Sequence, residues 1–117
     1  MSVLDPGQQF VARLRAAAGD FASAAGAGSA VVREAVPPAR HRRARCRVVL
    51  HYPDDTEVDV TFLGPAGRPA ASGRHGFDRQ IRRWLAAGLL TDQAWSVTDP
   101  DAPRGVAVDL TAWVAGA

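Results

Sequence analysis

The sequence predicts an α+β fold: an N-terminal helix, a β-hairpin, an amphipathic helix and a second β-hairpin, forming an antiparallel sheet with the helices on one face. Three patterns lead to this prediction. Apolar residues recur at every second position over residues 45–63, which is the spacing of half-buried strands. They recur at spacings of three and four over residues 77–87, which is typical of a helix with one buried face. Apolar residues again recur at every second position over residues 106–114. One sheet with helices packed on a single face accounts for these three segments.

The N-terminal helix, assigned to residues 1–25, is expected to start at Asp5. An aspartate accepts hydrogen bonds from the free amides at a helix start, and Pro6 is tolerated at the first helical position. Gln8 occupies the position of a capping-box partner. The residues expected on its apolar face are Phe10, Leu14, Ala17, Ala18 and Phe21.

Residues 26–43 form a joint that is rich in glycine, proline and arginine, and the sequence does not decide whether it is ordered. Residues 26–29 are expected to be a flexible connection. Residues 30–36 are expected to add a helical piece, which ends at Pro37 and Pro38 because proline disrupts a helix interior.

The first hairpin is predicted over residues 45–63, with its turn at residues 52–56. Opposed residues of an antiparallel pair share a face, so apolar residues should meet apolar residues. This condition pairs Leu50 with Val60 and Tyr52 with Val58, and it leaves a five-residue loop. A two-residue turn would place apolar residues opposite polar ones along the whole hairpin, so it is rejected. The predicted inward face consists of Cys46, Val48, Leu50, Tyr52, Val58, Val60 and Phe62.

The elements after the hairpin follow from the same patterns. Residues 64–76 are expected to form a loop, one of the places where a functional segment could lie. Residues 77–87 are expected to form the amphipathic helix, with Gly88 as a left-handed C-cap. Residues 94–98 and 106–114 are expected to form the second hairpin. The inward stripe of the helix is predicted to be Phe77, Ile81, Trp84 and Leu85.

The 117 residues fit one small domain with residues 44–117 as its sheet–helix core. No run approaches the roughly 20 apolar residues that a membrane-spanning helix needs, and no secretory signal pattern is present at the N-terminus. One cysteine, Cys46, cannot form an internal disulfide, which suits a reducing compartment. A cytoplasmic protein without membrane contact is therefore expected.

The chain contains 14 arginines and no lysine. Alanine, glycine, proline and valine are also abundant, which indicates a GC-rich genome, so the arginine count alone does not indicate a function. The arginines are unevenly placed: residues 1–47 carry eight arginines and three carboxylates, whereas residues 48–117 carry six arginines and nine carboxylates.

The candidate binding surface, for nucleic acid or an acidic partner, combines a basic run before the first strand with the polar side of the amphipathic helix. If the helix lies beside that strand, one positive surface results, and it would bind phosphates in a salt-dependent manner. The favoured alternative is two separate solvated faces, with an Asp78–Arg82 pair along the helix. The candidate residues are Arg40, Arg42, Arg43, Arg45, Arg47, Arg79, Arg82 and Arg83.

A catalytic alternative rests on His51, Asp59 and His75. Together with an arginine, they would provide the general base, general acid and cation of a small ribonuclease-like site. Their spacing is not diagnostic, and His51 opposite Asp59 is more simply a cross-strand polar pair. Three scattered histidines and one inward cysteine make no metal site, so neither metal nor cofactor is expected.

Two segments resemble known families. Residues 81–90 (IRRWLAAGLL), followed by residues 99–101 and 106–111, resemble the recognition helix and wing of winged-helix regulators, which implies DNA binding. The order of residues 50–52, residues 60–62, a helix and two further strands is similar to sporulation and cell-division regulators of filamentous bacteria. Neither resemblance assigns the chain to a family.

Taken together, the sequence favours a non-enzymatic binding, adaptor or regulatory protein of a GC-rich bacterium or its phage. It would act through arginine-rich surfaces or through a sheet edge. A protein partner or self-association is expected, and nucleic acid is a further candidate partner. Two alternatives stay open: a small nuclease-like hydrolase that uses His51 or His75, and a structural component of a larger assembly.

Overall fold

The computed structural model describes residues 5–67, 76–88 and 106–111, and within them it confirms the predicted α+β class. None of the described helices is long and apolar enough to cross a membrane. The elements are α1 (Pro6–Ala16), α2 (Ala18–Ala25), β1 (Ser29–Val36), β2 (Arg43–His51), β3 (Glu57–Ala66), α3 (Phe77–Ala86) and β4 (Val106–Asp109).

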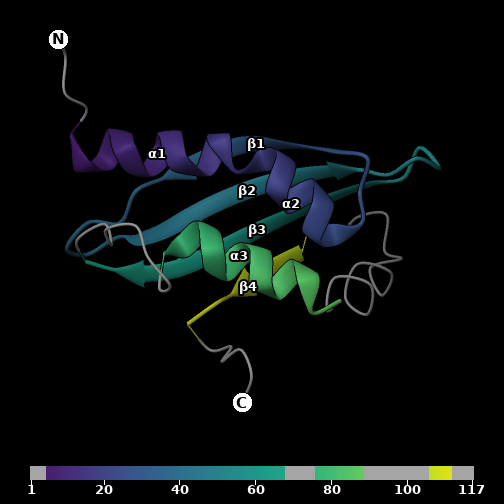
Figure 1. Cartoon of the computed structure of the whole chain (residues 1–117). Helices are drawn as coiled ribbons and strands as arrows, with labels where there is room; N and C mark the ends of the chain where they lie inside the picture. Colours follow the sequence, from purple (N-terminus) through teal and green to yellow (C-terminus); the bar gives the residue numbers. More distant parts are fainter. Residues whose placement is uncertain (1–4, 68–75, 89–105, 112–117) are drawn as a thin grey trace, which may run out of the picture.

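The four strands form one sheet in the order β1-β2-β3-β4, and the three helices lie together on one side of it (Figure 1). The two junctions between β1, β2 and β3 are antiparallel, as expected, but β4 runs parallel to β3. A parallel neighbour requires a crossover connection, and α3 lies within that connection. The sheet is therefore mixed rather than antiparallel throughout. The expected strand at residues 94–98 lies outside the described residues.

The predicted helix start is confirmed by a complete capping box. The Asp5 carboxylate accepts a hydrogen bond from the Gln8 amide at 2.7 Å, and the Gln8 side chain accepts one from the Asp5 amide at 3.0 Å. The helix predicted for residues 1–25 is divided at Ala17 into α1 and α2, and α2 ends at Gly26 in the left-handed conformation. Of the predicted apolar face, Phe10, Leu14, Ala17 and Phe21 are buried and Ala18 is partly buried.

The prediction of a helical piece at residues 30–36 is wrong, because this segment is strand β1. The Gly28 amide donates a hydrogen bond to the His51 carbonyl at 2.8 Å, so the chain enters the sheet directly after α2. The register shifts between Val32 and Glu34, which is the mark of a β-bulge. Since a bulge interrupts the alternation of faces, the sequence of this strand lacks a sustained period of two.

The hairpin at residues 45–63 is confirmed, but its register differs by two residues from the predicted one. Leu50 pairs with Val58 rather than with Val60, and His51 pairs with Glu57. The turn explains the difference: the Tyr52 amide donates to the Thr56 carbonyl at 2.9 Å, and Asp55 has a φ of 66°. These features are typical of a three-residue hairpin loop that ends in a left-handed residue. A shift of two residues keeps every side chain on its face, so the apolar pattern alone could not select this register.

The core lies between the sheet and the helices, and the predicted stripe of α3 faces it. Phe77, Ile81, Trp84 and Leu85 are all buried. The Phe77 ring stacks on Phe10 of α1, with centroids 5.8 Å apart. Gly88 has a φ of 77°, in agreement with the predicted left-handed C-cap. Strand β3 continues to Ala66, two residues beyond the predicted start of the loop at residue 64.

Cys46 is expected to behave as an inert core thiol. It is fully buried on the inner face of β2, and this burial raises the pKa of its thiol to about 12, although Arg15 opposes the shift. Because the thiolate is the reactive form, we expect an aromatic disulfide reagent at pH 8 to label the native protein at least about a hundredfold more slowly than the unfolded chain. Equal labelling rates with and without denaturant would contradict the burial of this side chain.

Candidate functional site

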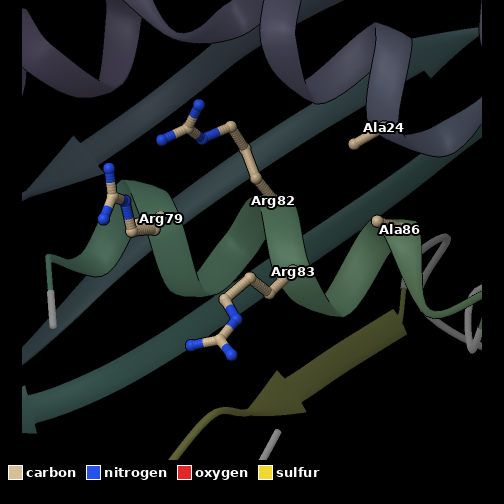
Figure 2. A pocket seen from close by; sticks show the side chains of 5 residues that line it. All are labelled: Ala24, Arg79, Arg82, Arg83 and Ala86. Atoms are coloured by element: carbon tan, nitrogen blue, oxygen red, sulfur yellow. The ribbon is translucent and has the colours of Figure 1, made fainter. Parts of the chain in front are cut away.

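The two groups of candidate arginines lie on opposite sides of the sheet. Along β2, Ala44 and Cys46 point into the core beneath the helices, so the alternating Arg43, Arg45 and Arg47 point to the outer face. The arginines of α3 lie on the helical side (Figure 2). The structure therefore does not bring the two groups into one positive surface, and the alternative of two separate faces holds.

The outer-face arginines are paired with carboxylates on neighbouring strands. Arg47 donates from its Nε to both carboxylate oxygens of Asp59 on β3, at 2.9 and 3.0 Å. Arg45 forms an ion pair with Glu34 on β1. Exposed pairs of this kind add little stability, but each neutralises the charge that a phosphate would need.

Arg43 reaches across β3 to β4. Its Nε donates to the Gly64 carbonyl at 2.9 Å, and its Nη2 contacts the Asp109 carboxylate and the Thr111 hydroxyl, the latter at 3.2 Å. These hydrogen bonds from Arg43, followed by those from Thr111, lower the pKa of Asp109 to about 2. Arg43 thus links the short parallel strand to the rest of the sheet.

This contact makes a pH-dependent contribution to stability. Because the pKa of Asp109 is lower in the folded chain than its ordinary value of 3.8, the stabilisation is present above that value and is lost as the pH falls toward 2. In Arg43→Gln, we expect the pKa of Asp109, followed by NMR of its carboxyl carbon, to move back toward 3.8. Asp54 serves as the control, because its lowered pKa depends on hydrogen bonds from Thr56. An unchanged Asp109 titration would show that Arg43 is not its partner.

The remaining arginines of the basic run are Arg42 and Arg40. Arg42 donates from Nε and Nη2 to the Pro37 carbonyl, at 3.1 and 2.8 Å, and closes the connection between β1 and β2. Arg40 is exposed and makes no ion pair or hydrogen bond within the described ranges. Most arginines of the predicted basic run therefore have partners within the sheet and its loop.

We call Arg79, Arg82 and Arg83 the α3 arginine face. Arg79 and Arg83 are exposed, and neither is paired with any residue that the structure describes. Arg82 Nη1 lies 3.8 Å from Oδ2 of Asp20 on α2. Arg82 Nη2 lies 4.0 Å from Oδ2 of Asp78, which confirms the pair expected along the helix. The Nε atom of Arg82 is buried, and no residue within the described ranges accepts a hydrogen bond from it.

A groove with a volume of about 620 Å³ runs beside this face (Figure 2). Its described lining contains Ala24 of α2 and Ala86 of α3 in addition to the three arginines. The groove thus combines small apolar side chains with guanidinium groups. Such a lining can hold an anionic group that carries apolar surface beside it.

His51 and Asp59 of the catalytic alternative do not pair with each other. His51 Nδ1 lies 3.5 Å from Glu57, whereas Asp59, its predicted partner, pairs with Arg47. His75 lies outside the described residues. Across residues 5–67, 76–88 and 106–111, no group of three or more histidine, cysteine, aspartate or glutamate side chains could hold a metal ion.

Sequence reasoning placed the α3 arginines on one side of a helix but missed Asp20 and Ala24, because the packing of α2 beside α3 is a tertiary feature. It also missed the carboxylate partners on the outer face. Asp59 alternates with the inward residues of β3, so the sequence indicated that it lies on the outer face. The correct register was also needed to identify the arginine that it pairs with.

Comparison of the chain with known protein families, curated proteins and solved structures found no match.

Proposed function

We propose that the chain is a non-enzymatic binding protein that contacts an anionic partner through the α3 arginine face. The observation that carries this proposal is the difference between the two arginine groups. On the outer face, Arg43, Arg45 and Arg47 each have a carboxylate partner, whereas Arg79 and Arg83 on α3 have none among the described residues.

The placement of the free charges supports the same proposal. Arg79 and Arg83 are four residues apart, so their side chains leave the same side of the helix, and their guanidinium groups point away from each other (Figure 2). Like charges at this spacing are mildly unfavourable for the helix, and neither contributes to the core. An anionic partner would remove this repulsion.

The β1 edge of the sheet is less well suited to binding a partner. The bulge in β1 twists the edge strand, and the exposed Arg33 adjoins it. A bulge and a charged side chain are features that discourage another strand from pairing with an edge. The hydrolase alternative receives no comparable support, because His51 and Glu57 form an exposed pair without a third catalytic group beside them in the described part of the chain.

The test is binding of two labelled polyanions, oligo-thymidine DNA and poly-glutamate, followed by fluorescence anisotropy at low and high salt. We expect at least one to bind, and the double variant Arg79→Gln/Arg83→Gln to weaken that binding at least about fivefold. The matched control is Arg33→Gln/Arg40→Gln, which removes the same charge from exposed positions away from α3. Absence of binding to both probes, or an equal loss in the control, would contradict the proposal.

A further inference from the structure

We propose that the groove between α2 and α3 binds an acidic α-helix of a partner protein. This inference rests on the proposed function and specifies the chemistry of the partner. Three features of the groove support it: the small side chains that line it, the spacing of Arg79 and Arg83 along α3, and the two carboxylates beside it.

The small side chains permit close approach. Ala24 and Ala86 come from the two helices that border the groove, and Ala86 is exposed (Figure 2). The distance between packed helices depends on the side chains at the contact, and alanine allows the shortest approach of any side chain with a Cβ atom. A third helix can therefore lie against α2 and α3 with its apolar face on the alanines, which is a common mode of peptide recognition.

The spacing of Arg79 and Arg83 along α3 matches a helical partner. Arg79 and Arg83 are four residues apart on α3, which places their Cα atoms about 6 Å apart along the helix axis. Two carboxylates at positions i and i+4 of an acidic helix have the same separation. Each could accept charge-assisted hydrogen bonds from one guanidinium group.

The same surroundings disfavour a nucleic acid. Asp20, whose side chain is 66% exposed, and Asp78 lie beside Arg82, so the three guanidinium groups are partly offset by two carboxylates. Nucleic acid affinity rises with the number of phosphates neutralised, and this face offers few. No aromatic side chain occurs in the described lining of the groove, so a stacking platform for bases is missing there.

The experiment uses the full chain and two alanine-rich peptides of about 15 residues, long enough for measurable helicity. One peptide carries glutamates at i and i+4 on one side, and the other carries glutamines at the same positions. We expect the glutamate peptide to bind and the glutamine peptide to bind at least about tenfold more weakly. Arg79→Gln and Arg83→Gln should each weaken the binding of the glutamate peptide about fivefold, and Arg33→Gln, at an exposed position on β1, should leave its binding unchanged.

A second variant tests the groove without changing charge. In Ala86→Trp, a bulky ring at an exposed position should obstruct the groove and weaken the glutamate peptide more than about tenfold, while circular dichroism shows an intact fold. Equal binding of the two peptides, or binding that Ala86→Trp leaves unchanged, would overturn the inference. If oligo-thymidine binds through Arg79 and Arg83 and the peptides do not, the inference is wrong while the proposed function stands. If no anionic probe binds, both are wrong.

Discussion

Trp84→Ala is expected to lower the free energy of unfolding by about 3–5 kcal/mol, the range for removal of a large buried aromatic side chain. Trp84 is only 2% exposed, and its ring meets Phe62 of β3 edge to face, with centroids 5.4 Å apart. This contact fixes α3 on the sheet and therefore sets the position of the α3 arginine face. Urea unfolding followed by circular dichroism measures the loss. The slope of the unfolding free energy against urea concentration should be the same in Trp84→Ala and in the parent if the folded and unfolded states keep their compactness.

The matched control is the neighbouring residue Arg83. Its side chain is exposed and has no described partner, so Arg83→Ala should change the free energy of unfolding by no more than about 0.5 kcal/mol. A loss below about 1 kcal/mol in Trp84→Ala would mean that α3 is not packed against β3 as described. In that case the groove between α2 and α3 would also lose its basis.

The parts of the fold that the sequence predicted are those that local spacing decides. The capping box at Asp5 involves residues three apart, and the stripe from Phe77 to Leu85 requires only that one side of a helix be apolar. The faces of β2 and β3 follow in the same way from alternation. In each case, the burial of apolar side chains and the local backbone geometry favour the same structure.

The parts that were missed depend on contacts between distant residues or on turn chemistry. The hairpin register was set by the left-handed Asp55 and not by the apolar pattern, which is unchanged by a shift of two residues. Strand β1 is bulged, so its sequence resembles a short helix as much as a strand. The direction of β4 depends on how the chain returns after α3, which alternation cannot indicate.

The candidate site shows the same division. The grouping of Arg79, Arg82 and Arg83 on the polar side of a helix was predicted from spacing. Which arginines are neutralised was not predicted, because Glu34, Asp59 and Asp109 come from three different strands and meet β2 only in the folded sheet. In the folded sheet, the arginines of the basic run therefore make contacts across strands. The shorter group on α3 is the stronger candidate for binding a partner.

Gly64→Ala is the second substitution for which we expect a large effect, a loss of about 2 kcal/mol in the free energy of unfolding. Gly64 is buried in β3, and an added Cβ atom would lie 3.0 Å from Cε1 of Phe77 and 3.2 Å from Cβ of Ala44. The Phe77 ring has little freedom to move away, because Phe10 stacks on it. The strain should therefore fall on the junction of α3 with the sheet, and urea unfolding again measures it.

The same substitution at Gly19 is the control, because nothing lies within 4 Å of the position that its Cβ atom would occupy in α2. Gly19→Ala should raise the free energy of unfolding by about 0.5–1 kcal/mol, since alanine loses less backbone entropy in a helix. The cause of the loss at Gly64 can be isolated by combining Gly64→Ala with Phe77→Leu. If the clash with the ring is responsible, the cost of Gly64→Ala should largely vanish in the Phe77→Leu background. An equal cost in both backgrounds would instead place the strain on Ala44 or on the strand itself.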